Sequence, residues 1–405
     1  MAYEKECENL INWYVYGKLP LSEIVFFITN RCNQRCVTCW QWEEDFIVSG
    51  KELPDEKWKE LLIEAIEMGA HHLYIVGGGE PMVRGELVLE LGEMAKKHGL
   101  FCVLHTNGTL LKKEHMDRLI QLCWDQIVVS LDGPNPGVND FIRGHGTFDK
   151  VYRNLIYIRD HRIYNGQPIP DLGINFTITS TNYKYIPEMV ELAKATGCGG
   201  IHATLVLPLS EQSKRFVLKE EEFKECLTFL KEGLALSRIY GIYSTFDSVM
   251  EEIDKKLKGE GEGFSASMES KKNSLINSFC VEPFLSLAIS SDGRVGPCCM
   301  FWTDSNPSIS ENSLKEIWEG EFIKRLREIL IRNAYSTLPP PCQSCPSQLR
   351  KRTEGIKRAL LEREKSASKN ILTLASRFLN RFKNEGVRGA VKRTWEYLYT
   401  LVRGI

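Results

Sequence analysis

The stretch Ile28-Thr-Asn-Arg-Cys32-Asn-Gln-Arg-Cys36-Val-Thr-Cys39-Trp40 places three cysteines in one short polar loop. It follows a β-branched and aromatic run, residues 24–28, which predicts a strand. Thiolates are soft ligands suited to iron–sulfur clusters, zinc or Cu(I). A [4Fe–4S] cluster normally has four thiolate ligands, so three local ones would leave one iron open to an exogenous ligand. A structural zinc loop, or cysteines that only pack, are the alternatives at this point.

Composition and cysteine use narrow the class of protein. The chain has 405 residues, 43% of them hydrophobic and 26% charged, which is an ordinary globular composition and enough for about two domains. Its 13 cysteines are an odd number and are partly clustered. No secretory signal pattern and no apolar run of roughly 18–20 residues stands out. We therefore expect cluster ligation rather than disulfides, and a cytoplasmic location. The net charge of −1 gives no indication of DNA binding.

Predicted strands and helices alternate from residue 23 to residue 240, which indicates parallel βαβ units. Strands are expected at 24–28, 72–76, 101–105, 127–130, 172–179 and 201–207, and helices at 86–98, 112–122, 147–162, 184–196 and 219–240, with a further helix opening at Pro54. Six strands fit a partial (β/α)6 TIM-like barrel, although a doubly wound sheet would give much the same pattern. In both α/β folds, ligands bind at the carboxyl ends of the strands.

Four unusual loops follow the first four predicted strands. They are the cysteine loop, Gly77-Gly-Gly-Glu80-Pro81, Thr106-Asn107-Gly108 and Ser130-Leu-Asp132-Gly133. Because parallel strands end at one edge of the sheet, we expect all four loops to meet on one rim and to form the site there.

With these loops, the first 240 residues resemble the core of radical S-adenosylmethionine (SAM) enzymes. The resemblance implies that Cys32, Cys36 and Cys39 ligate a [4Fe–4S] cluster whose open iron is chelated by SAM. It also implies reductive cleavage of SAM to a 5′-deoxyadenosyl radical, which abstracts a substrate hydrogen. The residues that it assigns to SAM binding are Gly78, Gly79, Glu80, Asn107, Ser130, Asp132, Arg143 and Trp40.

Two of these residues differ from the usual pattern or have a second possible role. The family usually places an aromatic residue just before the third cysteine, near adenine, and here that residue is Thr38. Trp40, directly after the cysteine, is the candidate for the adenine contact instead. Arg143 is expected either to pair with the SAM carboxylate, because a guanidinium suits a planar anion, or to form a surface salt bridge.

The C-terminal region resembles the SPASM/twitch extension of these enzymes. An Asp292-Gly293 hairpin, a helix over 314–331 and a Pro-Cys-x-x-Cys-Pro run stand in the expected order. The resemblance implies one auxiliary [4Fe–4S] cluster with the ligands Cys280, Cys298, Cys342 and Cys345, and Cys299 as a spare. A zinc site with four cysteines is the structural alternative. The remaining cysteines, expected in the core, are Cys7, Cys102, Cys123, Cys198 and Cys226.

The end of the chain is strongly basic. Residues 350–405 hold 15 Lys/Arg against 5 Asp/Glu, a local charge of 15 − 5 = +10. Two amphipathic helical segments within 371–403 interleave aromatic and basic side chains. They predict reversible contact with an anionic membrane, with a protein partner, RNA or docking onto the barrel as alternatives.

The sequence thus predicts five regions and one class of reaction. The regions are a helical lead-in (1–22), a radical SAM core (23–240), a connector (241–278), an auxiliary-cluster α+β domain (279–349) and a basic helical tail (350–405). The expected reaction is oxidation or other modification of a peptide or small metabolite, with the auxiliary cluster as electron acceptor and ferredoxin or flavodoxin as electron donor. A non-catalytic, zinc-stabilised or RNA-binding protein that uses the basic tail is the alternative.

Overall fold

A curved, mostly parallel sheet is the frame of the protein in the computed structural model, which describes residues 4–39, 41, 51–258, 280–331, 342, 355–356 and 359. Within these residues the sheet has nine strands in the order β7-β6-β5-β4-β3-β2-β1-β8-β9. The strands are β1 (Glu23–Phe27), β2 (His72–Val76), β3 (Phe101–Thr106), β4 (Gln126–Ser130), β5 (Asp171–Ile178), β6 (Gly200–Leu205), β7 (Tyr243–Ser244), β8 (Ser286–Ile289) and β9 (Val295–Gly296). All neighbours are parallel except the antiparallel pair β8 and β9.

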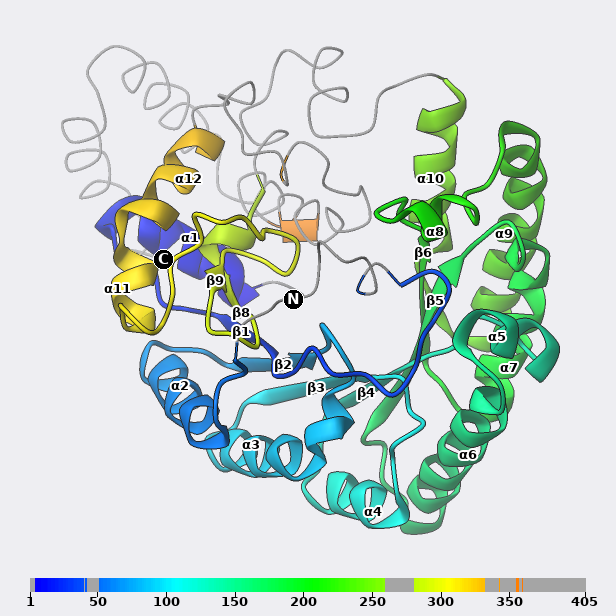
Figure 1. Ribbon diagram of the computed structural model, residues 1–405, viewed down its shortest axis with the longest axis horizontal. Helices are drawn as coiled ribbons and strands as arrows, with labels where there is room; N and C mark the ends of the chain where they lie inside the picture. The colour runs from blue at the N-terminus through cyan, green and yellow to red at the C-terminus, as the bar shows by residue number, and fades with distance from the viewer. Residues whose placement is uncertain are drawn as a thin grey trace, which may run out of the picture.

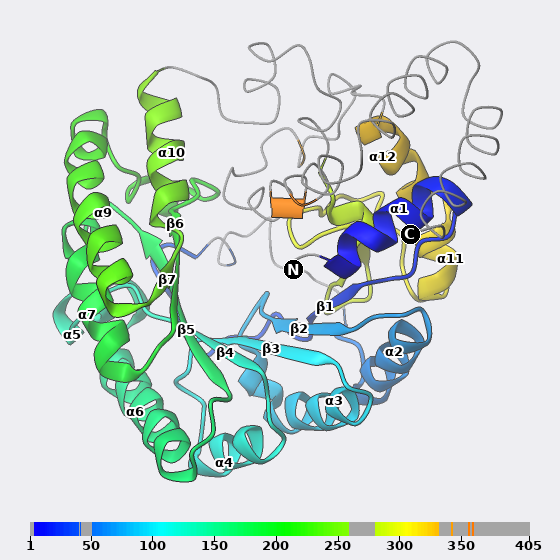
Figure 2. The ribbon, with the colours of Figure 1, turned by 180° about the vertical axis from the view of Figure 1, so that it is seen from behind.

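Helices cover the outer side of this sheet (Figures 1 and 2). The ring consists of α2 (Asp55–Glu67), α3 (Gly85–Lys97), α4 (Lys113–Gln121), α6 (Thr147–Asn165), α7 (Ile186–Thr196) and α9 (Glu220–Tyr240). The other helices are α1 (Glu4–Tyr16), α5 (Pro136–Arg143), α8 (Glu211–Lys214), α10 (Phe246–Leu257), α11 (Leu314–Glu319) and α12 (Glu321–Ile331), with the short 3-10 turns η3 (Pro81–Arg84), η4 (Tyr183–Tyr185) and η6 (Glu282–Phe284). A doubly wound sheet would carry crossover helices on both faces, so the expected partial barrel is confirmed.

The two faces of the barrel sheet differ in polarity, as β5 shows. Its side chains at Leu172, Ile174, Phe176 and Ile178 are buried in the main core, which the strands share with the outer helices. The alternate residues Asp171, Asn175 and Thr177 are only partly buried and therefore lie on the inner face. Strand β5 thus directs polar side chains to the inside of the barrel.

The C-terminal domain continues the barrel sheet and shares a second core with the N-terminal helix. Strand β8 pairs in parallel with β1, from Glu23 opposite Ser286 to Phe26 opposite Ile289. The second core joins residues far apart in the sequence: Cys7, Leu10, Val281, Phe284, Leu285, Phe301, Leu326, Leu330 and Ile356. Trp13 of α1 also contacts Phe284 edge-on, with ring centroids 4.8 Å apart. The N-terminal helix therefore packs as part of the C-terminal domain.

Three elements differ from the sequence expectation. The helix expected over 314–331 is broken into α11 and α12 at Gly320, whose φ of −77° and ψ of 168° are extended rather than helical. The stretch expected as a connector begins with β7 and with α10, whose apolar side chains Phe246, Val249 and Ile253 are buried. The segment around Phe141-Ile-Arg143 is helical as well, and its N-cap Asn135 accepts a hydrogen bond from the backbone N–H of Val138.

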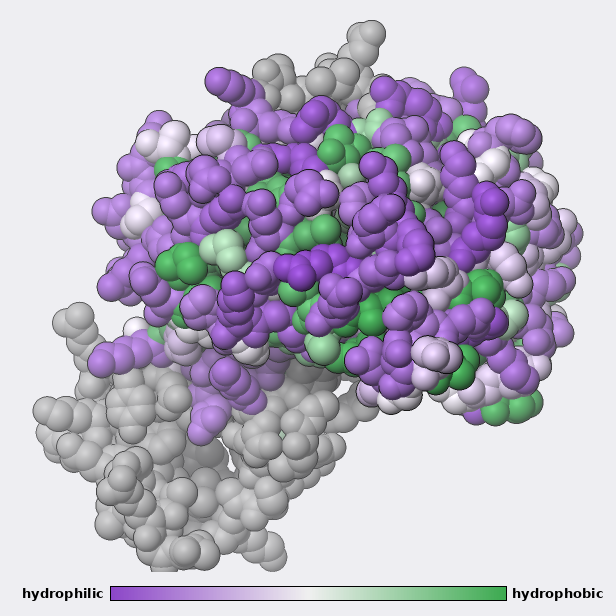
Figure 3. All heavy atoms as spheres, turned by 90° about the horizontal axis from the view of Figure 1, so that it is seen from below, coloured by the Kyte–Doolittle hydropathy of each residue, from purple (hydrophilic) through white to green (hydrophobic). Residues whose placement is uncertain are grey.

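The surface view in Figure 3 shows a mainly hydrophilic face with small, scattered hydrophobic areas. No helix among the described residues is long and apolar enough to cross a bilayer. The basic amphipathic segments within 371–403 lie outside the described residues, so their membrane contact stays a prediction.

Candidate active site

The cysteine loop, residues 29–39, leaves the carboxyl end of β1 and crosses the rim of the barrel. Its fold is fixed by backbone hydrogen bonds: the Val37 N–H donates to the Ile142 carbonyl at 2.9 Å, and the Cys39 N–H donates to the Cys36 carbonyl at 3.1 Å. The Gln34 N–H lies 3.4 Å from Cys32 Sγ, and Cys36 Sγ lies 3.5 Å from Gln34 Oε1. The loop therefore holds the cysteines through its own backbone and through the buried side chain of Gln34.

The environment of the three thiols suits a metal cluster. Burial raises the pKa of Cys36 to about 11, and burial is also the largest cause that raises the pKa of Cys32 and of Cys39. Without a cation these sulfurs are protonated at neutral pH, whereas coordination would ionise them. Buried Gln34 Nε2, next to the sulfurs, has no hydrogen-bond partner among the described residues. These residues fit an iron–sulfur cluster: the thiolates would ligate its irons, and the free N–H of Gln34 could donate a hydrogen bond to one of its sulfurs.

In the described part of the chain, no three His, Cys, Asp or Glu side chains are gathered as a preformed metal site. The structure brings Cys32, Cys36 and Cys39 close enough for their charges to influence one another's pKa. We therefore expect the three sulfurs to move together when a cluster binds, as in other metal sites that form only on binding.

The glycine loop, residues 77–81, packs directly against the start of the cysteine loop. The Gly79 N–H donates to the Thr29 carbonyl at 2.8 Å, and the Glu80 N–H donates to the Arg31 carbonyl at 2.9 Å. A Cβ on Gly78 would lie 2.2 Å from Asn30 Oδ1, and one on Gly79 would lie 2.0 Å from the Arg31 carbonyl oxygen. Glycine is required at position 79, because a side chain there would meet the Arg31 backbone and push the two loops apart, whereas at position 78 the Asn30 side chain would have to move aside.

Glu80 is a carboxylate buried at the meeting point of the loops. Its side chain, on a residue only 2% exposed, accepts hydrogen bonds from the Thr106 hydroxyl (2.5 Å), the Asn107 N–H (2.6 Å) and the Met82 N–H (3.0 Å). Burial raises the pKa of Glu80 and outweighs these hydrogen bonds, which lower it. Within the described residues it has hydrogen-bond donors but no ion pair. A buried carboxylate in this state would gain stability from a bound ammonium group.

Asn107 connects three of the rim loops. Its side-chain Nδ2 donates to Asn33 Oδ1 at 2.9 Å and lies 4.0 Å from Cys32 Sγ, while its backbone N–H binds Glu80. Ser130 lies at the end of β4, opposite Asn175 of β5 in the strand register, and is partly exposed. Asn107 therefore lies on the rim against the cysteine loop, and Ser130 lies at the carboxyl end of β4, while their contact with SAM stays a prediction.

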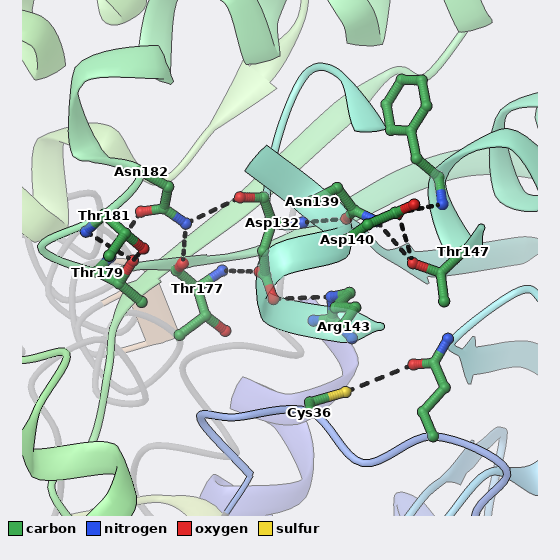
Figure 4. Close-up of polar contacts among 12 residues, drawn as sticks. Cys36, Asp132, Asn139, Asp140, Arg143, Thr147, Thr177, Thr179, Thr181 and Asn182 are labelled. Atoms are coloured by element: carbon green, nitrogen blue, oxygen red, sulfur yellow. Dashed lines mark hydrogen bonds and ion pairs between the residues drawn. The ribbon is translucent and has the colours of Figure 1, made fainter. Parts of the chain in front are cut away.

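Asp132 and Arg143 are paired with each other (Figure 4). Arg143 Nε lies 2.7 Å from Asp132 Oδ2, and the Asp132 side chain is fully buried while that of Arg143 is 13% exposed. The Thr177 N–H donates to the other carboxylate oxygen of Asp132 at 2.8 Å. The pair is thus a buried ion pair and not the surface salt bridge considered from the sequence. The Arg143 charge also lowers the pKa of Cys36, partly offsetting burial, so the guanidinium lies near the cysteines.

The proposed auxiliary ligands are only partly within the described chain. Cys280, Cys298 and Cys342 are partly buried and pack against the second core. Burial raises the pKa of Cys298 well above its usual value, and the charges of Cys299 and Cys280 add to this. Cys299 is exposed, and Cys345 and Trp40 lie outside the described residues.

Of the cysteines expected in the core, Cys7, Cys102, Cys198 and Cys226 are buried. The expectation for Cys123 is wrong, because this residue is exposed at the turn after α4, where its φ is 52°. Two further residues were not predicted from the sequence: Glu52, which contacts the start of the cysteine loop, and Arg84, which contacts Ile28 just before it. A single Glu or Arg in a loop has no spacing pattern that would reveal such a contact.

Comparison with known proteins identifies the family. The model of the radical SAM superfamily matches residues 26–193, and that of the SPASM iron–sulfur cluster-binding domain matches residues 280–346. The chain is 27% identical over 311 residues to the AdoMet-dependent heme synthase of Methanosarcina barkeri (75% of this chain, 84% of that protein). It is 27% identical over 336 residues to the PqqA peptide cyclase of Granulibacter bethesdensis (78% of each).

A solved structure agrees with these matches at the level of the fold. The crystal structure of Streptococcus suis SuiB bound to precursor peptide SuiA superposes with a TM-score of 0.58 at 16% identity, over 79% of this chain and 70% of that one. These findings favour an enzyme that uses a [4Fe–4S] cluster and SAM over the non-catalytic alternative. The chain belongs to the radical SAM superfamily and carries a C-terminal SPASM iron–sulfur cluster-binding domain.

Proposed function

We propose that this radical SAM enzyme holds its SAM-bound [4Fe–4S] cluster with Cys32, Cys36 and Cys39, and that it modifies a peptide. The observation that supports SAM binding is the buried Glu80 carboxylate, which accepts hydrogen bonds from three donors and lacks a cationic partner among the described residues. When bound, the cluster and SAM together supply a 5′-deoxyadenosyl radical that abstracts a hydrogen atom from the substrate.

The chain's own residues bind and orient these groups. The three thiolates hold the cluster, Glu80 binds the amine of SAM, and the narrow contact at Gly78 and Gly79 lets the backbone approach it. Asn107 and Ser130 are assigned to the nucleoside of SAM, and Arg143 is held near the cysteines by its ion pair with Asp132. Trp40 is assigned the adenine contact. Burial of Glu80 and Asp132 lowers the local dielectric constant and so strengthens their electrostatic contacts.

The C-terminal domain and the electron supply complete the proposal. Cys280, Cys298, Cys342 and Cys345 would hold one auxiliary cluster, whose chemistry is the transfer of single electrons. Ferredoxin or flavodoxin is the proposed electron donor. A peptide substrate is supported by the similarity to the PqqA peptide cyclase and by the fold shared with SuiB, whose crystal structure contains a precursor peptide.

The test of SAM chemistry uses the full chain, reconstituted with iron and sulfide without oxygen. Two cubane clusters require about eight irons per chain. With dithionite and SAM, the wild-type protein should release 5′-deoxyadenosine, measured by liquid chromatography with mass detection. Cys36→Ser should abolish this product, while Cys123→Ser should retain it, because Cys123 is an exposed cysteine away from the rim. Product from Cys36→Ser, or none from wild-type protein with full clusters, would contradict the proposal.

The substrate is tested by deuterium transfer. Peptides with perdeuterated residues should pass deuterium into 5′-deoxyadenosine if their hydrogen is abstracted. A small-molecule substrate is the second candidate, favoured by the 27% identity to the AdoMet-dependent heme synthase over 75% of this chain. Deuterium transfer from a labelled porphyrin, with none from any peptide tested, would decide for this second candidate.

A further inference from the structure

One carboxylate, on Glu52, holds the three residues that lead into the first cysteine. Its Oε1 accepts hydrogen bonds from the Thr29 hydroxyl at 2.6 Å and from the Asn30 N–H at 2.9 Å. Its Oε2 lies 3.3 Å from Arg31 Nε. Residues 29–31 also accept the two backbone hydrogen bonds from the glycine loop. Glu52 therefore supports the point at which the cysteine loop and the glycine loop meet.

Arg84 contacts the residues next to this meeting point, Ile28 and Leu53. It lies in η3, four residues after Glu80, and its side chain is only 9% exposed. Its Nη1 donates to the Ile28 carbonyl at 2.7 Å, and its Nη2 donates to the Leu53 carbonyl at 3.0 Å and pairs with Asp55. The guanidinium thus ties the segment just before the cysteine loop to the residue that follows Glu52. Its planar fork can reach both carbonyls at once, which a lysine ammonium cannot do with the same geometry.

Leu53 extends this connection to the SPASM domain. Its backbone N–H donates to the Ser291 carbonyl at 2.8 Å, in the turn between β8 and β9. Its side chain lies beside the same turn, since a Cβ on Gly293 would be 3.3 Å from Leu53 Cδ2. Glu52 therefore contacts the cysteine loop, and its neighbour Leu53 contacts the SPASM hairpin.

We propose that Glu52 and Arg84 are positioning residues which, with Leu53, form a clamp that fixes the cysteine loop against the glycine loop and the SPASM hairpin. This inference rests on the proposed function of these two loops. Neither residue need touch SAM or the cluster: the clamp acts through the placement of Cys32 and Glu80. Groups that orient metal ligands in this way typically change metal affinity or activity by roughly 10-fold to 100-fold when they are removed.

The hydrogen bonds, rather than the ion pair, should carry the effect of Glu52. Arg31 has a side chain that is 63% exposed, and exposed ion pairs contribute little. The hydroxyl of Thr29 is buried and the N–H of Asn30 is part-buried. Leaving either donor without its acceptor therefore costs more free energy than breaking the exposed ion pair. Burial by itself would raise the pKa of Glu52, but these donors and the charges of Arg31 and Arg84 lower it, so the acceptor is ionised at neutral pH. Glutamine keeps an acceptor oxygen in place, whereas alanine removes it.

The experiment compares SAM binding by reconstituted full-length variants with equal iron content. Electron paramagnetic resonance of the reduced protein is recorded during a SAM titration, and the SAM concentration that gives half of the spectral change is measured. Glu52→Ala should require roughly 10-fold to 100-fold more SAM, whereas Glu52→Gln should stay within about threefold of wild type. Glu60→Ala is the matched control, because Glu60 forms an exposed pair with Lys57 at 3.0 Å on α2 and contacts neither loop.

The outcomes separate the clamp from the proposed function. Equal SAM titrations for Glu52→Ala and wild type would overturn the clamp. An equal loss of SAM binding in Glu52→Gln and Glu52→Ala would also overturn it, because the loss would then be due to the missing charge and not to the missing acceptor oxygen. If Glu52→Ala fails to retain iron, Arg84→Lys decides in its place: weaker SAM binding at full iron content supports the clamp, and unchanged binding contradicts it. A wild-type protein with full iron and no response to SAM would instead refute the proposed function.

Discussion

Glu80 combines a structural cost with a proposed binding role. Burial raises its pKa above the ordinary value, so the folded protein holds a proton there at pH values where the unfolded chain has lost it. The stability of the SAM-free protein should therefore fall as pH rises from the unfolded pKa through the raised folded pKa. Glu80→Gln cannot titrate and should not show this fall. The melting temperature of Glu80→Gln relative to that of wild type should therefore increase as the pH rises above the ordinary pKa of glutamate, measured by scanning fluorimetry.

The same substitution should weaken SAM binding. Loss of a charge-assisted hydrogen bond costs about 1.5–3 kcal/mol, which corresponds to roughly 10-fold to 100-fold in affinity. A variant that becomes relatively more stable at high pH and yet binds SAM poorly would separate the two roles of Glu80. A melting-temperature difference that does not change with pH would show that the carboxylate is not held protonated by burial.

Among single residues, those with an unusual type and spacing could be identified from the sequence. Cys32, Gly79 and Glu80 belong to compact patterns after predicted strands, and the structure places them on one rim. Glu52 and Arg84 could not be found this way, because each acts across a long separation in the chain and belongs to no local pattern. The pairing of Asp132 with Arg143 was also missed, because an ion pair depends on how a loop and a helix end meet in space.

Gly92 shows how closely an outer helix packs on the barrel. It lies in α3, and a Cβ there would be 1.9 Å from Cζ3 of Trp124, a fully buried ring. Gly92→Ala should destabilise the protein by roughly 1–3 kcal/mol, because the ring or the helix must move. Gly200→Ala is the matched control: its Cβ would be 3.7 Å from Tyr243, and its effect should stay within about 1 kcal/mol. Denaturant midpoints measure both, and equal midpoints for the two variants would contradict the packing argument.

Elements with strong local signals were predictable, and those that depend on distant partners were not. The strand over 72–76 and the start of α6 at Thr147 lie where periodicity placed them. The break at Gly320 was missed because the apolar positions on either side, Trp318 and Phe322, continue one helical pattern. The hairpin of β8 and β9 was predicted, but its pairing with β1 was not, since strand partners distant in sequence leave no local trace.

The way in which the two domains share a sheet decides how the whole molecule responds to truncation. A chain that ends at residue 258 would lose β8, and β1 would then present an unpaired edge from Glu23 to Phe26. It would also expose Cys7 and Leu10 of α1, which are buried only in the second core. Unpaired edges and exposed apolar faces promote association. We therefore expect residues 1–258 to aggregate, measured by size-exclusion chromatography with light scattering, while full-length Cys298→Ala stays monodisperse because it keeps β8. A monodisperse truncated barrel that still takes up about four irons would show instead that the barrel folds without its C-terminal domain.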